Sequence, residues 1–151
     1  MIDQSVLSRV GKWSTFFLNG EMLAVRVEDV QEILMAQPLT QVPLSGAHVL
    51  GLLNLRGHVM PVLDLRPRLG LAGSANPSEG KLLVVASDTE PYALLVDDIG
   101  DVIHLDDKGW LPVPSTLGVK ERAHVFGIHP IQSRIVLGLR LADLWSDEKR
   151  E

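Results

Sequence analysis

Apolar and polar residues alternate in short runs along this chain, and turn-forming residues separate the runs. The segment from Gly51 to Leu71, GLLNLRGHVMPVLDLRPRLGL, shows this pattern best. An apolar run meets Asn54-Leu55-Arg56-Gly57, and a second run with apolar residues at nearly alternate positions follows. Two strands joined by a short glycine-containing turn produce such a pattern. We therefore expect a β-hairpin with Arg56 at its tip.

The chain also contains an internal repeat. Residues 21–34 read EMLAVRVEDVQEIL, and residues 90–103, which lie 69 positions later, read EPYALLVDDIGDVI, with 4 of the 14 positions identical. A second similarity has a spacing of 76, where HVMPVLDL from His58 corresponds to RIVLGLRL from Arg134, and Gly51 corresponds to Gly127. One small β unit used twice explains both similarities.

The repeat predicts a single all-β domain over residues 1–151 that contains two similar small barrels. We place the first barrel at residues 12–70, the second at residues 81–146 and a flexible linker at residues 71–80. A unit of about 70 residues is near the lower size limit of a stable domain, so the barrels are expected to pack together.

Short helical turns complete the predicted elements. The apolar residues of the EDVQEIL segment recur at helical spacing, which favours a short turn that faces the core. We expect such turns at Glu28–Leu34, Asp97–Gly100, Leu65–Leu69 and Arg140–Trp145.

Composition narrows the function classes. The net charge is −5 with a pI near 5.5, so no nucleic-acid surface is expected. The absence of cysteine excludes disulfides and thiolate chemistry. No stretch approaches the roughly 20 apolar residues of a membrane span, and we see no signal peptide.

Catalytic patterns are also missing from the sequence. The five histidines show no helical metal-binding spacing, and no serine lies in a Gly-x-Ser-x-Gly elbow. Phosphate-binding loops, dinucleotide fingerprints and calcium loops are absent as well. We therefore expect no catalytic, cofactor-binding or metal-binding residues, and no enzymatic activity.

The chain resembles the CheW-like chemotaxis coupling proteins from about Trp13 to Trp145. The resemblance rests on FFLNGEMLAVRVEDVQEIL, on Gln41–Pro43, on the Gly51–Leu71 segment and on VDDIGDVIHL at Val96–Leu105. The combination of Asn-Leu-Arg-Gly with Pro-Val-x-Asp-Leu-Arg is specific. It implies two five-stranded, SH3-like β-barrels around a shared hydrophobic core.

The resemblance also implies a function. Proteins of this family are cytoplasmic adaptors that bridge the cytoplasmic tips of chemoreceptors to the regulatory domain of a histidine autokinase. In this family, receptor contact is expected near the V-x-E-I segment and the groove between the barrels. The residues of this chain at those positions are Val30, Glu32, Ile33, Asn54 and Arg56. The kinase contact is expected on the first barrel, without a residue assignment.

Two alternatives stay open. Leu23 stands where the family usually has an aromatic residue, and Ser45-Gly46 occupies a region where proline is common. Coupling proteins of pilus-motility or surface-sensing pathways share the fold, so the chain fits such a pathway too. From a different class, a small β-barrel that binds a metabolite or an oligonucleotide is possible, although acidity and scarce aromatic residues disfavour the oligonucleotide.

Glu32 and Arg56 both lie in motifs that carry the resemblance. If the short turn after the second strand packs beside the hairpin tip, the two side chains meet. The planar guanidinium of arginine suits a bidentate contact with a carboxylate. We expect a partly buried ion pair, because apolar residues flank both positions, with Val30 as an adjoining apolar contact.

Overall fold

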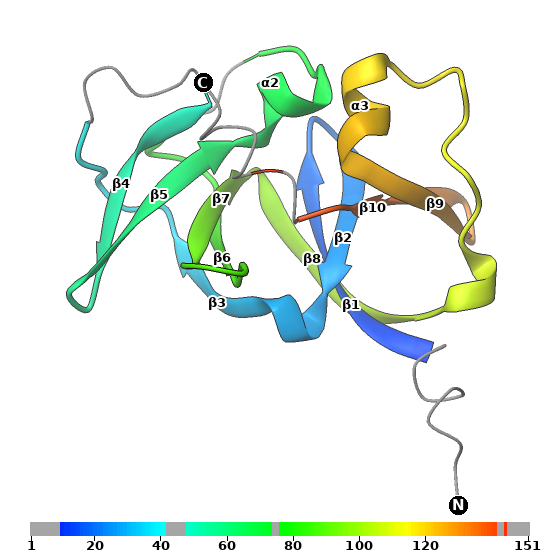
Figure 1. Ribbon diagram of the computed structural model, residues 1–151, viewed down its shortest axis with the longest axis horizontal. Helices are drawn as coiled ribbons and strands as arrows, with labels where there is room; N and C mark the ends of the chain where they lie inside the picture. The colour runs from blue at the N-terminus through cyan, green and yellow to red at the C-terminus, as the bar shows by residue number, and fades with distance from the viewer. Residues whose placement is uncertain (1–9, 42–47, 74–75, 142–143, 145–151) are drawn as a thin grey trace, which may run out of the picture.

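The computed structural model describes residues 10–41, 48–73, 76–141 and 144 (Figure 1). These residues form ten strands in two five-stranded sheets. The first sheet has the order β8-β1-β2-β10-β9, and its strands are Asp98–Asp106, Val10–Leu18, Glu21–Arg26, Arg134–Leu139 and Val125–Ile131. The second has the order β3-β6-β7-β5-β4, and its strands are Val30–Met35, Lys81–Val85, Tyr92–Val96, His58–Asp64 and Val49–Leu55.

The short helices lie between strands. Two are 3-10 turns, η1 at Val27–Asp29 and η2 at Asp107–Gly109. Two are α-helical, α2 at Leu65–Leu69 and α3 at Val119–His124. The expected turn at Leu65–Leu69 is thus confirmed, and its first turn is capped because the Asp64 carboxylate accepts a hydrogen bond from the backbone N–H of Arg66. The helix α3 was not expected from the sequence.

The internal repeat is confirmed by the sheet order. If β1–β5 are matched in turn with β6–β10, the order of one sheet becomes the order of the other. The parallel pairs have the same register: Ala24 lies opposite Gly138, and their counterparts Ala93 and Val62 also lie opposite each other. The two spacings seen in the sequence therefore mark equivalent strands in two similar sheets, as the CheW-like resemblance implied.

The expected division into residues 12–70 and 81–146 is wrong, because each sheet takes strands from both halves. The chain starts in the first sheet with β1 and β2, passes to the second for β3–β7, and returns for β8–β10. Residues 71–80 connect α2 to β6 within the second sheet, so they are not a linker between barrels. The repeats exchange strands, and this makes the two sheets one interleaved unit.

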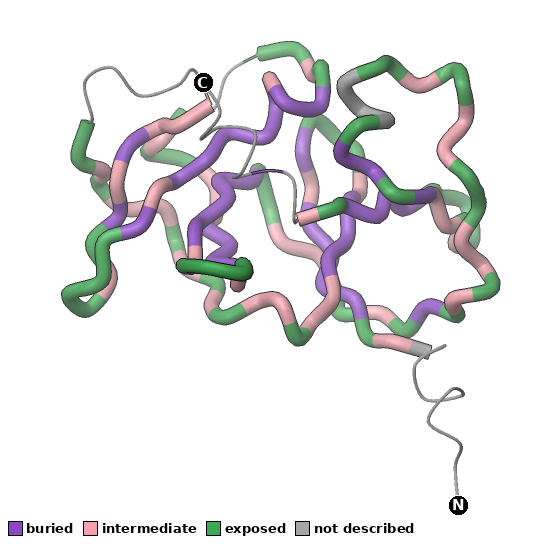
Figure 2. The backbone as a smooth tube through the Cα atoms, in the orientation of Figure 1, coloured by how far each residue is buried: buried purple, intermediate pink, exposed green. Residues whose placement is uncertain are grey.

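Buried residues follow the strands of both sheets, whereas the tip of the β4–β5 hairpin is exposed (Figure 2). The largest buried cluster contains side chains from both sheets, among them Phe16, Leu23, Leu83 and Leu94. Two smaller clusters each belong to one sheet, around Leu53 in the second and around Trp13 in the first. The shared core that the sequence predicted is therefore present.

The expected helical turn at Glu28–Leu34 is wrong beyond Asp29. Residues Val30–Met35 form the edge strand β3, in which half-buried and exposed side chains alternate. The turn expected at Asp97–Gly100 is wrong too, because β8 begins at Asp98. Half of Arg140–Trp145, most of Gln41–Pro43 and all of Ser45-Gly46 lie outside the described residues.

Gly51 and Gly127 occupy equivalent close approaches between backbone segments. A Cβ atom at Gly51 would lie 2.8 Å from the carbonyl oxygen of Thr40, and one at Gly127 would lie 2.9 Å from that of Leu111. Each contact accompanies a single bridge, Thr40 to Leu52 and Leu111 to Ile128. The glycine pair found in the sequence therefore marks the same close approach of two backbone segments in each sheet.

We expect Gly51→Ala and Gly127→Ala each to lower the free energy of unfolding by about 1–3 kcal/mol, because backbone must shift to admit the methyl group. Chemical denaturation of the two variants checks this. A Gly127→Ala variant as stable as the parent would contradict the equivalence of the two close approaches.

Candidate functional site

The β4–β5 hairpin ends in a two-residue turn of Arg56 and Gly57. Both residues have positive φ angles, 52° and 85°, as the tight hairpin turns that match strand twist require. The Asn54 side-chain oxygen accepts a hydrogen bond from the Gly57 N–H at 3.1 Å. The turn therefore holds Arg56 at the tip, as the sequence predicted, and Asn54 is occupied in shaping that turn.

Glu32 and Arg56 form a bidentate ion pair, which confirms their predicted contact. Arg56 Nη1 donates to Glu32 Oε1 at 3.0 Å, and Arg56 Nη2 donates to Glu32 Oε2. Glu32 comes from the edge strand β3, not from a helical turn. The pair thus links one edge of the second sheet to the tip of the hairpin that contains the other edge strand, β4.

The expectation of a partly buried pair is wrong for the arginine. The Arg56 side chain is 69% exposed and that of Glu32 is 28% exposed. The hydrogen bonds from Arg56 lower the pKa of Glu32 below its usual value, which loss of solvation opposes and the positive charge of Arg56 reinforces. At neutral pH the pair is an accessible surface feature whose charges are already matched.

The other nominated residues differ in accessibility. Ile33 is 45% exposed on β3, whereas Val30 is half-buried and packs against the shared core. Two exposed apolar residues on strands of the second sheet were not nominated: Met35 on β3, and Val59, which pairs with Asn54. The alternation Ile33, Met35 is the sequence signal that would have found Met35 if β3 had been recognised as a strand.

The ion pair should be visible in a pH titration of Glu32. The pKa of Glu32 is lowered in the folded state. The ion pair therefore stabilises the fold above the usual glutamate pKa, and this effect is lost as pH falls through the lowered value. We expect the Glu32 carboxyl carbon, followed by NMR, to titrate at lower pH in the parent than in Arg56→Gln. Equal pKa values in the two proteins would contradict the contact.

The described part of the chain contains neither a cluster of metal-ligating side chains nor a membrane-spanning helix. Its His, Asp and Glu residues form no group of three that would hold a metal ion. None of its helices is long and apolar enough to cross a membrane. A polar hollow is lined by Arg66, Asn76, Glu79, Gly80, Leu95, Val96 and Asp97. Arg66 and Asp97 are paired with each other, so this hollow presents no free arginine to an anion.

Two interleaved SH3-like sheets with an exposed ion pair and apolar edge residues define a small all-β binding module. A family model described as "CheW-like domain" matches residues 12–149, so the chain belongs to the CheW-like domain family. The resemblance proposed from the sequence is thereby confirmed.

Individual relatives agree with this assignment. The chain is 31% identical over 137 residues to "Chemotaxis protein CheW" of Rhizobium meliloti (strain 1021), which covers 90% of this chain and 88% of that protein. The crystal structure of scaffolding protein TtCheW from Thermoanaerobacter tengcongensis superposes with a TM-score of 0.78 at 26% identity, over 87% of this chain and 90% of that one.

A further relative belongs to a differently named protein. "Protein PilI" of Pseudomonas aeruginosa PAO1 is 30% identical over 97 residues, which are 63% of this chain and 54% of that protein. This similarity is shorter than the match to the Rhizobium protein.

Proposed function

We propose that this protein is a scaffold that couples the cytoplasmic tips of chemoreceptors to a histidine autokinase in a chemotaxis array. Membership of the CheW-like family over nearly the whole chain is the observation that carries the proposal. The names of the relatives, a chemotaxis protein and a scaffolding protein, support it. The protein acts in the cytoplasm and without catalysis of its own.

The receptor side of this scaffold is the face around β3 and the hairpin tip. Ile33 offers an apolar contact there, and Arg56 offers an exposed guanidinium. Glu32 and Asn54 hold that face in shape through their hydrogen bonds, and Val30 anchors β3 to the shared core. This division assigns direct contact to Ile33 and Arg56 and a supporting role to the other three.

A second candidate is the coupling protein of a pilus-motility pathway, which the similarity to PilI favours. The two candidates share the mechanism and differ in the receptor and kinase that they join. A ligand-binding barrel has less support, because buried side chains such as Leu53, Met60 and Val62 already fill the hydrophobic cluster of the second sheet.

Calorimetric titration of the purified protein tests the proposal. A receptor-tip fragment and a kinase regulatory domain from the same genome should each bind and should together give a three-part complex. We expect each interface to bury about 1,000–1,600 Å² in total. Absence of binding to both partners, or robust hydrolase, transferase or nucleic-acid-binding activity in the isolated chain, would overturn it.

A further inference from the structure

The chain passes between the two sheets twice, and the two crossings are equivalent in the repeat. The first runs from β2 through η1 to β3, and the second runs from β7 through Asp97 to β8. Glu28 in the first crossing and Asp97 in the second are separated by the repeat spacing of 69. In Figure 1 η1 lies at the bottom of the view, and α2, which contains Arg66, lies at the top.

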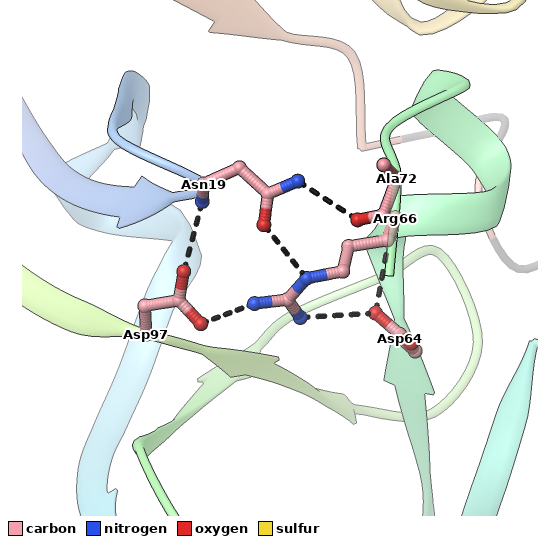
Figure 3. A network of polar contacts seen from close by, with 5 residues as sticks. All are labelled: Asn19, Asp64, Arg66, Ala72 and Asp97. Carbon is pink, nitrogen blue, oxygen red and sulfur yellow. Dashed lines mark hydrogen bonds and ion pairs between the residues drawn. The ribbon is translucent and has the colours of Figure 1, made fainter. Parts of the chain in front are cut away.

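A closed polar network holds the second crossing (Figure 3). Arg66 Nε donates to Asn19 Oδ1 at 2.9 Å, Nη2 donates to Asp97 Oδ1, and Nη1 contacts Asp64 Oδ1 at 3.4 Å. Asp97 Oδ2 also accepts from the Asn19 N–H at 2.8 Å, and Asn19 Nδ2 donates to the Ala72 carbonyl at 2.9 Å. All three nitrogens of the guanidinium are therefore engaged.

The partners of Arg66 belong to different parts of the fold. Asn19 lies in the turn between β1 and β2 of the first sheet, whereas Asp64 ends β5 of the second sheet and Arg66 lies in α2, directly after that strand. The Arg66 side chain is 9% exposed. A nearly buried arginine with three placed acceptors is a rigid connection, because a planar guanidinium fixes direction as well as distance.

The first crossing has no such connection among the described residues. Glu28 approaches Arg26 at 3.7 Å, and these side chains are 61% and 39% exposed. An exposed pair of this kind contributes little, because solvent screens it. In the sequence repeat the counterpart of Arg66 is Ala142, so an alanine stands at the equivalent position of the second repeat.

We propose that Arg66 is a positioning residue whose clamp with Asn19 and Asp97 sets the angle between the two sheets. The sheets are fixed to each other at the clamped end, so the clamp determines the spacing at the opposite end, where η1 leads into β3. The clamp would then hold a partner on the first sheet and a receptor on β3 in one relative orientation. This consequence for coupling rests on the proposed function.

Spin-label distances test the clamp without any partner. The parent chain has no cysteine, so His58→Cys on β5 and His104→Cys on β8 give one label on each sheet at exposed strand positions. We expect one narrow distance distribution in this parent. Asp97→Asn and Arg66→Lys should broaden or shift it, because neither retains the full fork of charge-assisted bonds. Glu28→Gln is the matched control at the equivalent crossing and should leave it unchanged.

The result that overturns the proposal is a parent-like distribution in folded Asp97→Asn and Arg66→Lys, or equal broadening in Glu28→Gln. Binding gives an independent reading. The clamp variants should bind each single partner as the parent does and lose about tenfold in assembling the three-part complex. The distances are measured on the free protein, so they can support the clamp even if neither proposed partner binds. Failure of the clamp proposal and failure of the proposed scaffold function are therefore distinguishable.

Discussion

Leu94→Ala should lower the free energy of unfolding by about 2–5 kcal/mol and should do so for both sheets together. Leu94 is fully buried on β7 of the second sheet, and its cluster includes Phe16 and Leu23 of the first. Truncation removes apolar contacts and leaves a cavity that the surrounding strands fill only in part. Because the largest buried cluster takes side chains from both sheets, loss of Leu94 is expected to destabilise the two sheets together.

Tryptophan fluorescence makes this prediction sharp. Trp13 lies on β1 of the first sheet and Trp110 packs in the same cluster, while Trp145 lies outside the described residues. In a Trp145→Phe background, fluorescence therefore reports on the first sheet and Leu94→Ala perturbs the second. The fluorescence and circular-dichroism transitions should shift together, whereas Val102→Ala, at an exposed position, should shift neither by more than about 0.5 kcal/mol. A fluorescence midpoint that stays at the parent value would contradict the shared core.

Arg56→Ala should weaken binding of the receptor-tip fragment about tenfold, which is about 1.4 kcal/mol, and should leave thermal melting nearly unchanged. The guanidinium is exposed at the hairpin tip, where few contacts depend on it except the pair with Glu32. Its removal deletes a direct contact and leaves the Glu32 carboxylate unpaired on the receptor face, where binding would have to desolvate it. The loss should therefore appear in binding before it appears in stability.

The repeat supplies a matched control for Arg56. Gln132 is its counterpart in the β9–β10 turn and has a similar φ angle, 45° against 52°. Gln132→Ala should bind the receptor tip as the parent does. Glu32→Ala combined with Arg56→Ala should lose less affinity than the two single losses added, because each single variant already breaks the pair. Additive losses would show that the pair does not act as a unit in binding.

The sequence predicted the strands more reliably than the way in which they pair. The shared residues of the two repeats predicted equivalent β2 and β7 and equivalent β5 and β10, and the register confirms both. Similarity between the two repeats does not show which repeat provides the neighbour of a given strand. Strands paired within one repeat and strands exchanged between the repeats satisfy the same local pattern. The exchange of strands, and with it the true sheet membership, became visible only in the tertiary structure.

The candidate site shows the same limit at the level of single residues. Ile33 and Leu34 with Val30 fit a helical spacing, but β3 is an edge strand that exposes Ile33 and Met35. The Glu32–Arg56 contact was nonetheless predicted, because both residues lie in motifs that carry the resemblance and a guanidinium suits a bidentate contact with a carboxylate. The clamp was missed: Arg66, Asn19 and Asp97 are far apart in sequence and lie in no shared motif.

If this protein makes a kinase responsive to a receptor, as we propose, a reconstituted system should show that dependence. Receptor-containing membranes and the histidine autokinase from the same genome would be combined with and without the purified chain, and kinase autophosphorylation would be measured. We expect the receptor to alter kinase activity only when the chain is present, and we expect Arg56→Ala to weaken this effect while Gln132→Ala does not. Receptor control of the kinase that is equally strong without the chain would contradict the proposal.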